Sequence, residues 1–353
     1  MIKLRVNGQD FSGWQTVQVV RSLESVANKF SLTVSERWTN QDTSWPIREE
    51  DECRVLIGSE TVITGYVDRR SLSFGPEEHS VSVEGRDRTG DLVDCSAVLD
   101  KWEFYKPSLL GLAKKLCAPY GIEVSLQPGL SLPAAPAKFS IDPGDSVHNA
   151  IERLCRLFGV LATSDGQGGL RLMRPGSTRA TTELVQGQNV LAASSSFDAT
   201  DRFRTYKVLG QHRGTDELNG AQAASVKGTA EDLNVRRTTR TLLVRPEGNV
   251  TAEHAKRRAE WEATTRAARG DSVSVTVQGW TQSNGTLWPL NSIVRVRCPW
   301  IHVDGDLLIT QAEHSLDDGG MVTQLTLRQL NAFQPEPTVS KESNEWKELK
   351  GGV

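Results

Sequence analysis

The sequence predicts an α+β fold that is mainly β: two similar small β-barrel domains, an intervening α+β module and an additional helix-bearing insertion. Three observations predict this arrangement. Apolar residues alternate with polar ones in short strands over residues 1–100, and the alternation returns over 270–333. Two apolar stripes with helical spacing interrupt the β pattern within 101–178. The two β regions also share a weak internal repeat.

The first β-barrel domain is assigned to residues 1–100. Ile2, Leu4 and Val6 alternate with polar residues, and Asn7-Gly8 follows as a turn. Several short strands joined by regular turns are typical of a small barrel or sandwich. Further apolar runs lie at 17–19, 30–34, 54–57 and 61–67.

The α+β module is assigned to residues 101–178. Apolar residues over 109–120 fall on one face of a helix, and a clearer stripe covers 147–158. Gly159 follows the second stripe, where a glycine commonly ends a helix. The glycine-rich segment 165–169 is interpreted as a hairpin turn, because it lacks the Gly-Lys-Ser/Thr of a phosphate-binding loop.

The second β-barrel domain is assigned to residues 179–245 and 270–333, with a helix over 246–269 between the two parts. The polar, Ala- and Gly-rich stretch 214–234 is interpreted as a long loop. The helix has a thin apolar face, so we expect it on a surface or against a neighbouring subunit. This thin apolar face of the helix consists of Ala255, Ala259 and Ala263. The composition of residues 334–353 predicts a mobile tail.

The internal repeat has the same order of features in both β regions. An apolar strand at Ile63, a polar stretch, Ser-Leu and a glycine turn lead into the alternating strand at Val81. The same order runs from Ile309 to the alternating strand at Val322. Coincidence is the alternative. A genuine repeat means that the chain holds two similar barrels separated by the α+β module.

Bulk composition excludes several classes of protein. The formal net charge of −3 argues against a protein that coats nucleic acid. No apolar run approaches the roughly 20 residues of a membrane helix, so no stable membrane insertion is expected. The opening residues are predicted to be a strand rather than a signal peptide, so we expect synthesis in the cytoplasm. The five widely spaced cysteines include no Cys-x-x-Cys, which argues against a zinc site or disulfide framework.

A dense run of charges follows the alternating strand at Val81. Such a run can be a catalytic loop, but a salt-bridged connection or an interface is the commoner case, because paired charges offset each other's desolvation when their geometry is fixed. The run also lies where the first barrel should lead into the α+β module. It contains Glu84, Arg86, Asp87, Arg88, Asp91 and Asp94.

Signals of an enzyme are poor. Ser146 follows Gly144-Asp145 in a pattern that resembles an esterase nucleophile block, but helix capping explains it better, and His148 diverges from Ser146 at that spacing. Asp304 and Asp306 could donate carboxylates to a cation, but they lack the further spaced ligands of a calcium loop. No catalytic residue, metal site or cofactor is therefore assigned.

Several segments resemble the baseplate hub proteins of Mu-like contractile-tailed phages. The most specific resemblance is Gly65-Tyr66-Val67-Asp68 followed by the run from Gly85 to Ser96, with its Gly-Arg-Asp-Arg-Thr-Gly-Asp-Leu core. Pro143-Gly144-Asp145-Ser146, the segment 165–174 and the closing stretch 315–330 support it. The family is in turn similar to the hub of larger contractile phages.

The resemblance implies a structural, non-enzymatic hub without cofactors. Two related barrels per chain would assemble as a homotrimeric ring that joins the six-fold tail tube to the three-fold spike, with DNA passing through its lumen. The implied partners are other copies of the chain, the spike protein, and the tail tube or other baseplate proteins. The implied location is the virion tail baseplate, assembled in the host cytoplasm.

Closed assembly of such a ring requires side-to-side contacts. We expect these contacts in the charged run, on the thin helix and at exposed tryptophans. Arg86 and Arg88 can pair across a subunit boundary. Pairing inside one chain is the alternative. The interface candidates are Arg86, Asp87, Arg88, Asp91, Asp94, Arg257 and Trp261.

Two alternative functions stay open at this point. A cell-wall or lipid hydrolase carried on a tail would use Ser146, or the pair Asp304 and Asp306. A host-surface glycan-binding module would stack sugars on tryptophan side chains, although tryptophan more often anchors cores and interfaces. The tryptophans considered for this role are Trp280, Trp288 and Trp300.

Overall fold

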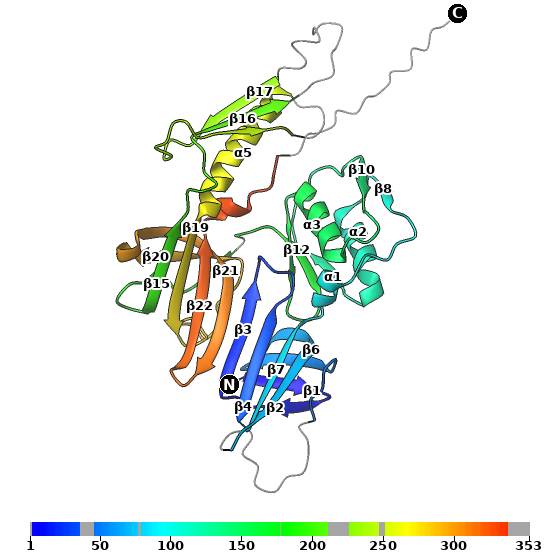
Figure 1. Cartoon of the computed structure of the whole chain (residues 1–353), viewed down its shortest axis with the longest axis vertical. Helices are drawn as coiled ribbons and strands as arrows, with labels where there is room; N and C mark the ends of the chain where they lie inside the picture. Colours follow the sequence, from blue (N-terminus) through cyan, green and yellow to red (C-terminus); the bar gives the residue numbers. More distant parts are fainter. Residues whose placement is uncertain are drawn as a thin grey trace, which may run out of the picture. The chain divides into compact units, whose positions relative to one another are not determined.

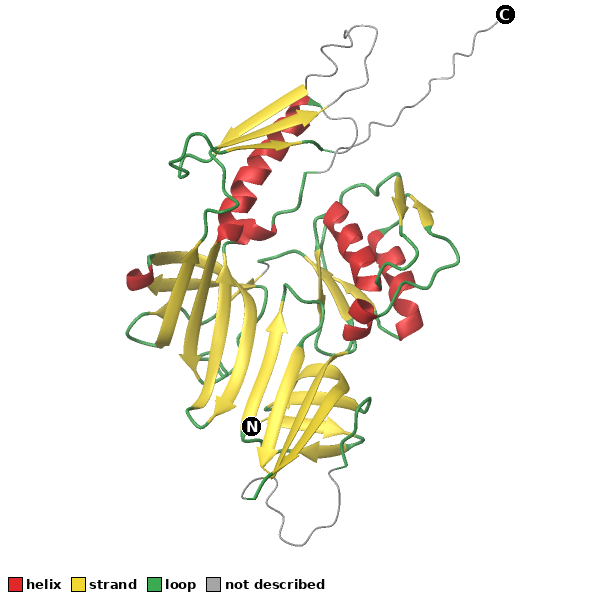
Figure 2. Ribbon diagram, viewed as in Figure 1, coloured by secondary structure: helices red, strands yellow, loops and turns green. Residues whose placement is uncertain are grey.

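The structure is a computed structural model of the 353-residue chain, and it describes residues 2–35, 46–76, 79–176, 178–210, 226–246 and 251–337. The chain forms two compact units. One consists of Met1–Asp201 with Thr265–Pro335, and the other of Arg202–Thr264 with Glu336–Val353. Strands dominate the first unit, and the helices within residues 90–158 lie together in one region (Figure 2).

The N-terminal β region is a set of antiparallel strands whose alternate residues are buried. Its core contains Leu4, Leu32 and Val83, each fully buried. The strong alternation follows from the two-residue period of a strand, which sends successive side chains to opposite faces. The strands are β1 (Ile2–Val6), β2 (Gln9–Phe11), β3 (Thr16–Ser22), β4 (Lys29–Ser35), β5 (Glu52–Ile57), β6 (Glu60–Phe74) and β7 (His79–Asp87) (Figure 1).

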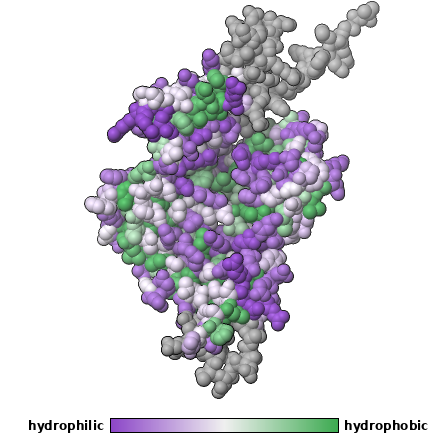
Figure 3. Space-filling view, in the orientation of Figure 1, coloured by the Kyte–Doolittle hydropathy of each residue, from purple (hydrophilic) through white to green (hydrophobic). Residues whose placement is uncertain are grey.

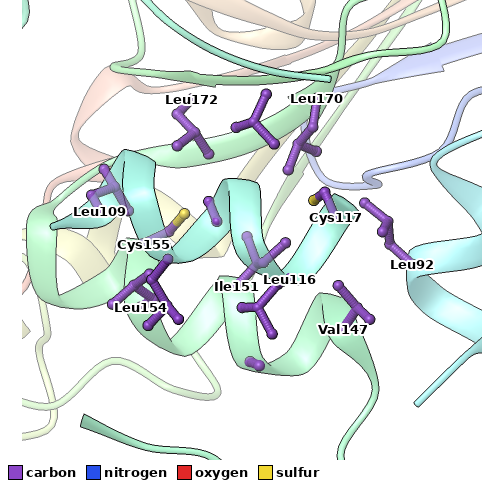
Figure 4. Packing of buried hydrophobic residues seen from close by; sticks show 14 of the residues in the cluster. Leu92, Leu109, Leu116, Cys117, Val147, Ile151, Leu154, Cys155, Leu170 and Leu172 are labelled. Carbon is purple, nitrogen blue, oxygen red and sulfur yellow. The ribbon is translucent and has the colours of Figure 1, made fainter. Parts of the chain in front are cut away.

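The α+β module has its own hydrophobic core. Side chains of its two main helices point toward each other and toward one strand, and Leu116, Ile151 and Leu172 lie in this core (Figure 4). Gly159 ends the second main helix with a left-handed φ of 64°. The elements are α1 (Gly90–Asp94), β8 (Glu103–Tyr105), α2 (Leu109–Cys117), η1 (Ala118–Tyr120), β9 (Val124–Leu126), β10 (Lys138–Ser140), α3 (Val147–Phe158), β11 (Leu161–Ser164) and β12 (Leu170–Met173).

The C-terminal β region also consists mainly of strands around its own hydrophobic core. Val275, Ile309 and Leu325 are fully buried in its core. Its elements are β13 (Thr178–Arg179), β14 (Leu184–Val185), β15 (Val190–Phe197), β19 (Asp271–Gln278), β20 (Ser292–Cys298), η2 (Pro299–Ile301), β21 (Val303–Asp317), β22 (Gly320–Arg328) and η3 (Leu330–Phe333).

The second unit is a small sheet covered by a long helix. Strands β16 (Thr205–Gly210), β17 (Val226–Glu231) and β18 (Thr241–Val244) form this sheet, apart from the large one. Helix α5 (Ala252–Gly270) starts in this unit. Strand β17 occupies part of the stretch 214–234 that the sequence suggested as a loop, while 211–225 lie outside the described residues, as do 338–353 of the predicted tail.

The large sheet joins the two β regions edge to edge. Its strand order is β15-β19-β22-β21-β3-β4-β7-β6-β5-β1-β2, with β20 pairing β21 beside this path. Among the described strands, no pairing closes either region into a barrel. The two predicted barrels are therefore not confirmed, because β3 pairs with β21 and merges both regions into one continuous sheet. The mainly β character of the chain is confirmed.

The internal repeat is present in the strand topology. The order β3-β4-β7-β6-β5 corresponds to β15-β19-β22-β21-β20, with antiparallel pairs throughout. The β6–β7 ladder is irregular just after Val67, and the β21–β22 ladder just after Ile309. The amides of Glu50 and Asn291 donate to the carbonyls of these two residues. Both donors also have left-handed φ angles, 70° and 61°, so the two copies share detailed backbone geometry.

Among the described helices, none combines the length and the apolar composition needed to cross a membrane.

Gly65 tests how closely the backbones of β6 and β7 pack at this point of the sheet. A Cβ atom there would overlap the backbone carbonyl oxygen of Arg86 on the neighbouring strand. We expect Gly65→Ala to lower the free energy of unfolding by about 3 kcal/mol, since backbone cannot move aside cheaply. Gly305→Ala, in β21 with open space around the new methyl group, should cost less than about 1 kcal/mol. Urea unfolding of both variants measures the difference, and equal losses would contradict the packing argument.

Candidate functional site

The charged run connects the end of β7 to the first helix of the module. Arg86 Nε lies 2.7 Å from Asp68 Oδ2 in β6, and Arg86 Nη2 lies 2.7 Å from Asp94 Oδ2 in α1. The hydrogen bond from Arg86 lowers the pKa of Asp94. One guanidinium group therefore holds the sheet and α1 together within a single chain.

Arg88 also pairs inside the chain. Its Nη2 donates to Glu52 Oε1 in β5 at 3.0 Å, and its guanidinium lies 5.8 Å from the centre of the Tyr66 ring. Its backbone amide donates to the carbonyl of Thr64. The structure thus places ion-pair partners of Arg86 and Arg88 in their own chain, as in the second of the two alternatives, and a role of these arginines at a subunit boundary stays a prediction.

Asp87 lies inside the protein rather than on a surface, with only 2% of the residue exposed. Its carboxylate accepts hydrogen bonds from the amides of Asn28 and Thr64, each at 3.1 Å. The Ser164 hydroxyl of the module also bonds to it. Burial raises the pKa of Asp87 to about 6 in spite of these bonds. The side chain ties three parts of the fold together from within.

The other two interface candidates of the run, Asp91 and Asp94, lie in α1. Asp91 is half-buried in the first turn of α1, where loss of hydration raises its pKa. Asp94 is exposed apart from its contact with Arg86. Sequence reasoning missed Thr89, which is fully buried and donates its hydroxyl to the carbonyl of Val26 at 2.8 Å. Threonine at a charged turn gives no local sign of such a distant partner.

The glycine-rich turn of the module, residues 165–169, also contacts the first β region. The carbonyl of Gly166 accepts a hydrogen bond from the Thr64 hydroxyl, and the Gln167 side chain donates to the carbonyl of Thr61. A Cβ atom on Gly166 would crowd the backbone of Val62, so this turn needs glycine in order to approach β6 closely. The predicted hairpin turn is therefore part of the structural attachment between the module and the first β region.

Arg257 and Trp261 lie one turn apart on α5, in the second unit. Arg257 is exposed and pairs with Glu253 at 3.5 Å. The Trp261 ring is half-buried, with the Arg258 guanidinium 4.9 Å from its centre. The five interface candidates of the charged run lie within β7, α1 and the turn between them, whereas these two helix residues lie on a separate element.

The alanine face of α5 packs within its own chain. Ala255 and Ala259 are fully buried against Tyr206 and Val208 of the small sheet. A Cβ atom on Gly228 would overlap the backbone at Ala255, so small residues let helix and strand approach closely. The thin apolar face of the helix is therefore covered within its own chain, and a contact of the helix with a neighbouring subunit stays a prediction.

The residues proposed for hydrolysis are engaged in structure. The Ser146 hydroxyl accepts the amide of Asn149 and caps α3. Asp304 forms an ion pair with Arg295, and Asp306 pairs with Arg179 at 2.7 Å. These bonds explain the residues without catalysis. Of the three tryptophans considered for glycan stacking, two are buried and only Trp300, 84% exposed, is at the surface.

No cluster in the described parts of the chain gathers three or more His, Cys, Asp or Glu side chains in a way that could hold a metal ion. A cavity of about 450 Å³ lies where the first β region, the module and the segment 286–291 meet. Arg21 and Glu60 both line this cavity, and their charged atoms lie 4.0 Å apart. Opposite charges at that separation offset each other, so the cavity does not present a strong field of one sign.

Two strand edges with exposed apolar side chains were missed as site candidates. Leu72 and Phe74 near the end of β6 are 61% and 86% exposed, and Phe197 at the end of β15 is 56% exposed. Hydrophobic residues are visible at the surface toward the lower end of the large sheet (Figure 3). The available signal was apolar alternation, Ser71-Leu72-Ser73-Phe74, in a strand that is otherwise polar at its end.

Asp87 should make stability depend on pH in the direction opposite to a salt-bridged carboxylate. Its folded pKa of about 6 exceeds the unfolded value of about 3.9. The folded state therefore binds the proton more tightly, and stability falls as pH rises from 4 through 6, by up to about 3 kcal/mol. Urea unfolding at pH 4 to 7 should show this loss relative to Asp87→Asn, which cannot titrate.

The surface carboxylate of Asp10 is the control for the sign of this pH dependence. A hydrogen bond from Arg5 lowers the pKa of Asp10, so its contribution to stability is lost as pH falls rather than as pH rises. A wild type and an Asp87→Asn variant whose unfolding free energies differ by the same amount at every pH would show that Asp87 is not buried as described.

Removing Arg86 should lower stability without changing assembly. Arg86→Ala deletes the bonds to Asp68 and Asp94, and we expect a loss of about 1–2 kcal/mol because the group is partly exposed. Arg156→Ala breaks only an exposed pair with Glu152 and should cost about 0.5 kcal/mol or less. Urea unfolding and sedimentation measure both effects. Weaker association with unchanged monomer stability would instead place Arg86 at an interface.

Three family models match successive parts of the chain. Residues 1–87 match the N-terminal domain of Mu phage baseplate assembly protein GpP-like proteins. Residues 89–174 match the second domain of baseplate hub protein gp44-like proteins. Residues 251–336 match the fourth domain of Mu phage baseplate assembly protein GpP. The boundary between the first two matches falls at Arg88, inside the charged run.

Similar proteins extend over nearly the whole chain. Baseplate hub protein gp44 of Escherichia phage Mu is 33% identical, covering 100% of this chain and 94% of that protein. The 43 kDa tail protein of prophage MuSo2 from Shewanella oneidensis has 31% identity and a TM-score of 0.85, covering 95% of this chain and 99% of its own.

A type VI secretion component of E. coli, described as structurally similar to the phage T4 tail proteins gp27 and gp5, shares the fold at a TM-score of 0.57. Its identity is 9%, with 96% of this chain and 79% of that chain covered. The full-length match to the Mu hub, the successive family models and the shared fold agree: this chain belongs to the baseplate hub family of Mu-like phages.

Proposed function

We propose that the chain is the structural hub of a contractile-tail baseplate and works as a homotrimeric ring. The ring joins the tail tube to the central spike and lets DNA pass. One observation carries this proposal: a single chain contains two copies of the same five-strand arrangement, placed side by side in one sheet. Each copy then serves as one barrel-like segment of the ring.

Symmetry gives the physical reason for two copies per chain. Three chains with two similar segments each provide six similar segments, so such a ring can meet a six-fold partner on one face and a three-fold partner on the other. A chain with one segment would need six copies and would lose the three-fold match. The repeat therefore supports a role between two structures of different symmetry.

The polar face of the large sheet supports passage of DNA. Small neutral side chains are joined across strands on this face: the Thr33 hydroxyl donates to that of Ser82, and Gln324 donates to the Ser274 hydroxyl. Gln18 and Glu313 are bonded across the junction between the two copies. The same face carries Arg69, Arg86 and Arg328, each paired with a carboxylate of its own chain. With these charges offset, few unpaired cations remain on the described part of the face to retain phosphates, which suits transit rather than stable binding.

The proposal places the protein in the virion baseplate, after assembly in the host cytoplasm. Its partners are two further copies, the spike protein, and tail-tube or other baseplate proteins. The role is structural rather than catalytic, in keeping with the hub and tail names of its relatives and with the structural bonds of Ser146, Asp304 and Asp306.

Sedimentation equilibrium over a range of protein concentrations at low salt tests this proposal. We expect a species of three times the 38.8 kDa chain mass, because the free edges of the sheet need partners. Negative-stain images of that species should show a ring with a central opening. A strict monomer at high concentration would count decisively against the homotrimer.

A further inference from the structure

We propose that a second copy of the chain pairs the β15 edge of its sheet with the C-terminal half of β6, in a register given by the internal repeat. This inference rests on the proposed homotrimer and identifies the strands that form its subunit boundary.

The in-chain junction is the pairing of β21 with β3. Ala312 lies opposite Arg21, His314 opposite Val19, and Leu316 opposite Val17. These residues share the core face of the sheet, and Ala312, His314 and Val19 are fully buried. The fourth strand of one repeat copy thus pairs with the first strand of the other copy, and both strands gain cover for their core face.

The equivalent strands at the other ends of the two copies are β6 and β15. Residue numbers in β6 and β7 differ from their equivalents in β21 and β22 by a constant 242, as for Val67 and Ile309. In the first copy, Val17 of β3 lies opposite Leu32 of β4, which in turn lies opposite Val83 of β7. In the second copy, Ala193 of β15 lies opposite Val275 of β19, which lies opposite Leu325 of β22, the equivalent of Val83. Ala193 therefore occupies the position of Val17.

These two edges lack the neighbour that their equivalents have. In the described chain, residues 69–74 of β6 pair only with β7, and β15 pairs in a ladder only with β19. Leu72 and Phe74 are the equivalents of His314 and Leu316, yet they are exposed. Phe197, the equivalent of Arg21, is exposed on β15. Apolar side chains on the core face with no strand beside them mark an incomplete sheet.

The repeat predicts the register of the missing pairing. Transferring the β21–β3 partners brings exposed aromatic and aliphatic side chains of both edges onto one covered face, and serines face each other on the polar side. An arginine and an aspartate meet at one end, where opposite charges directly across strands are favourable. The expected antiparallel pairs are Arg69–Asp198, Arg70–Phe197, Ser71–Ser196, Leu72–Ser195, Ser73–Ser194 and Phe74–Ala193.

A second copy is the occupant that fits both edges at once. Each chain offers one β6 edge and one β15 edge, and these are different surfaces, so the contact is head to tail and must close into a ring or continue as a filament. Junctions inside chains then alternate with junctions between chains around the ring. Both kinds of junction join the same two strand positions of the repeat.

Disulfide trapping tests the register directly. The pairs Leu72→Cys with Ser195→Cys, and Ser73→Cys with Ser194→Cys, place directly opposite residues within reach of a disulfide. Ser73→Cys with Ser195→Cys is the control, because a shift of one residue puts the two sulfurs on opposite faces. The parent chain with its five free cysteines is oxidised in parallel.

We expect at least one matched pair to form covalent dimers and trimers on a non-reducing gel, with the control and the parent chain unlinked. A trimeric wild type whose matched pairs cross-link no more than the control would overturn this inference and leave the proposed hub intact. A wild type that is strictly monomeric would overturn the hub proposal itself. The two failures are therefore distinct.

A charge placed on the edge gives an independent measurement. Leu72→Asp should raise the dissociation constant of the trimer by about tenfold or more, because the new carboxylate would be buried beside the partner strand. Leu243→Asp changes a leucine of similar exposure, 60%, on β18 of the other unit and should leave association unchanged. Circular dichroism confirms that both variants fold. Equal association of the two variants would refute the edge pairing.

Discussion

The pairing of β3 with β21 is the constraint on which the large sheet depends. It joins strands almost 300 residues apart, as the Gln18–Glu313 hydrogen bond across a sequence separation of 295 shows. Without it, two antiparallel sheets would each expose an edge and part of a core. With it, Val19 and His314 are covered and their backbone groups are paired. Burial of His314 lowers its pKa to about 3, which keeps the side chain neutral at this junction.

The charged run performs a second kind of joining, between the first β region and the α+β module. Burying a carboxylate is costly, so Asp87 is a poor source of stability in itself. Its oxygens instead accept amides from two separate segments and a hydroxyl from the module, which defines how these parts meet. Arg86 and Arg88 add ion pairs around the outside. The region with the strongest family resemblance is thus a structural joint.

These two joints divide the work of a hub between stability and assembly. The interior joint fixes the module on its β region, while in the proposed ring the β6 edge and the β15 edge pair with other chains. Exposed strand edges normally risk uncontrolled aggregation. In the proposed ring, one specific complementary edge on each chain converts that risk into closed assembly, because each added chain presents the same two surfaces.

The sequence by itself determined the local features: alternating strands, the stripe of α3 over 147–158 with its Ser146 cap, and the repeated order of strands near Ile63 and Ile309. Local periodicity and capping reflect neighbours within a few residues, so they can be read directly. Only the tertiary structure decided which groups meet across long distances: that the arginines of the charged run pair in their own chain, that the alanine face of α5 is covered, and that β3 pairs with β21 instead of closing a barrel. Those partners depend on how the whole chain comes together, which no local pattern encodes.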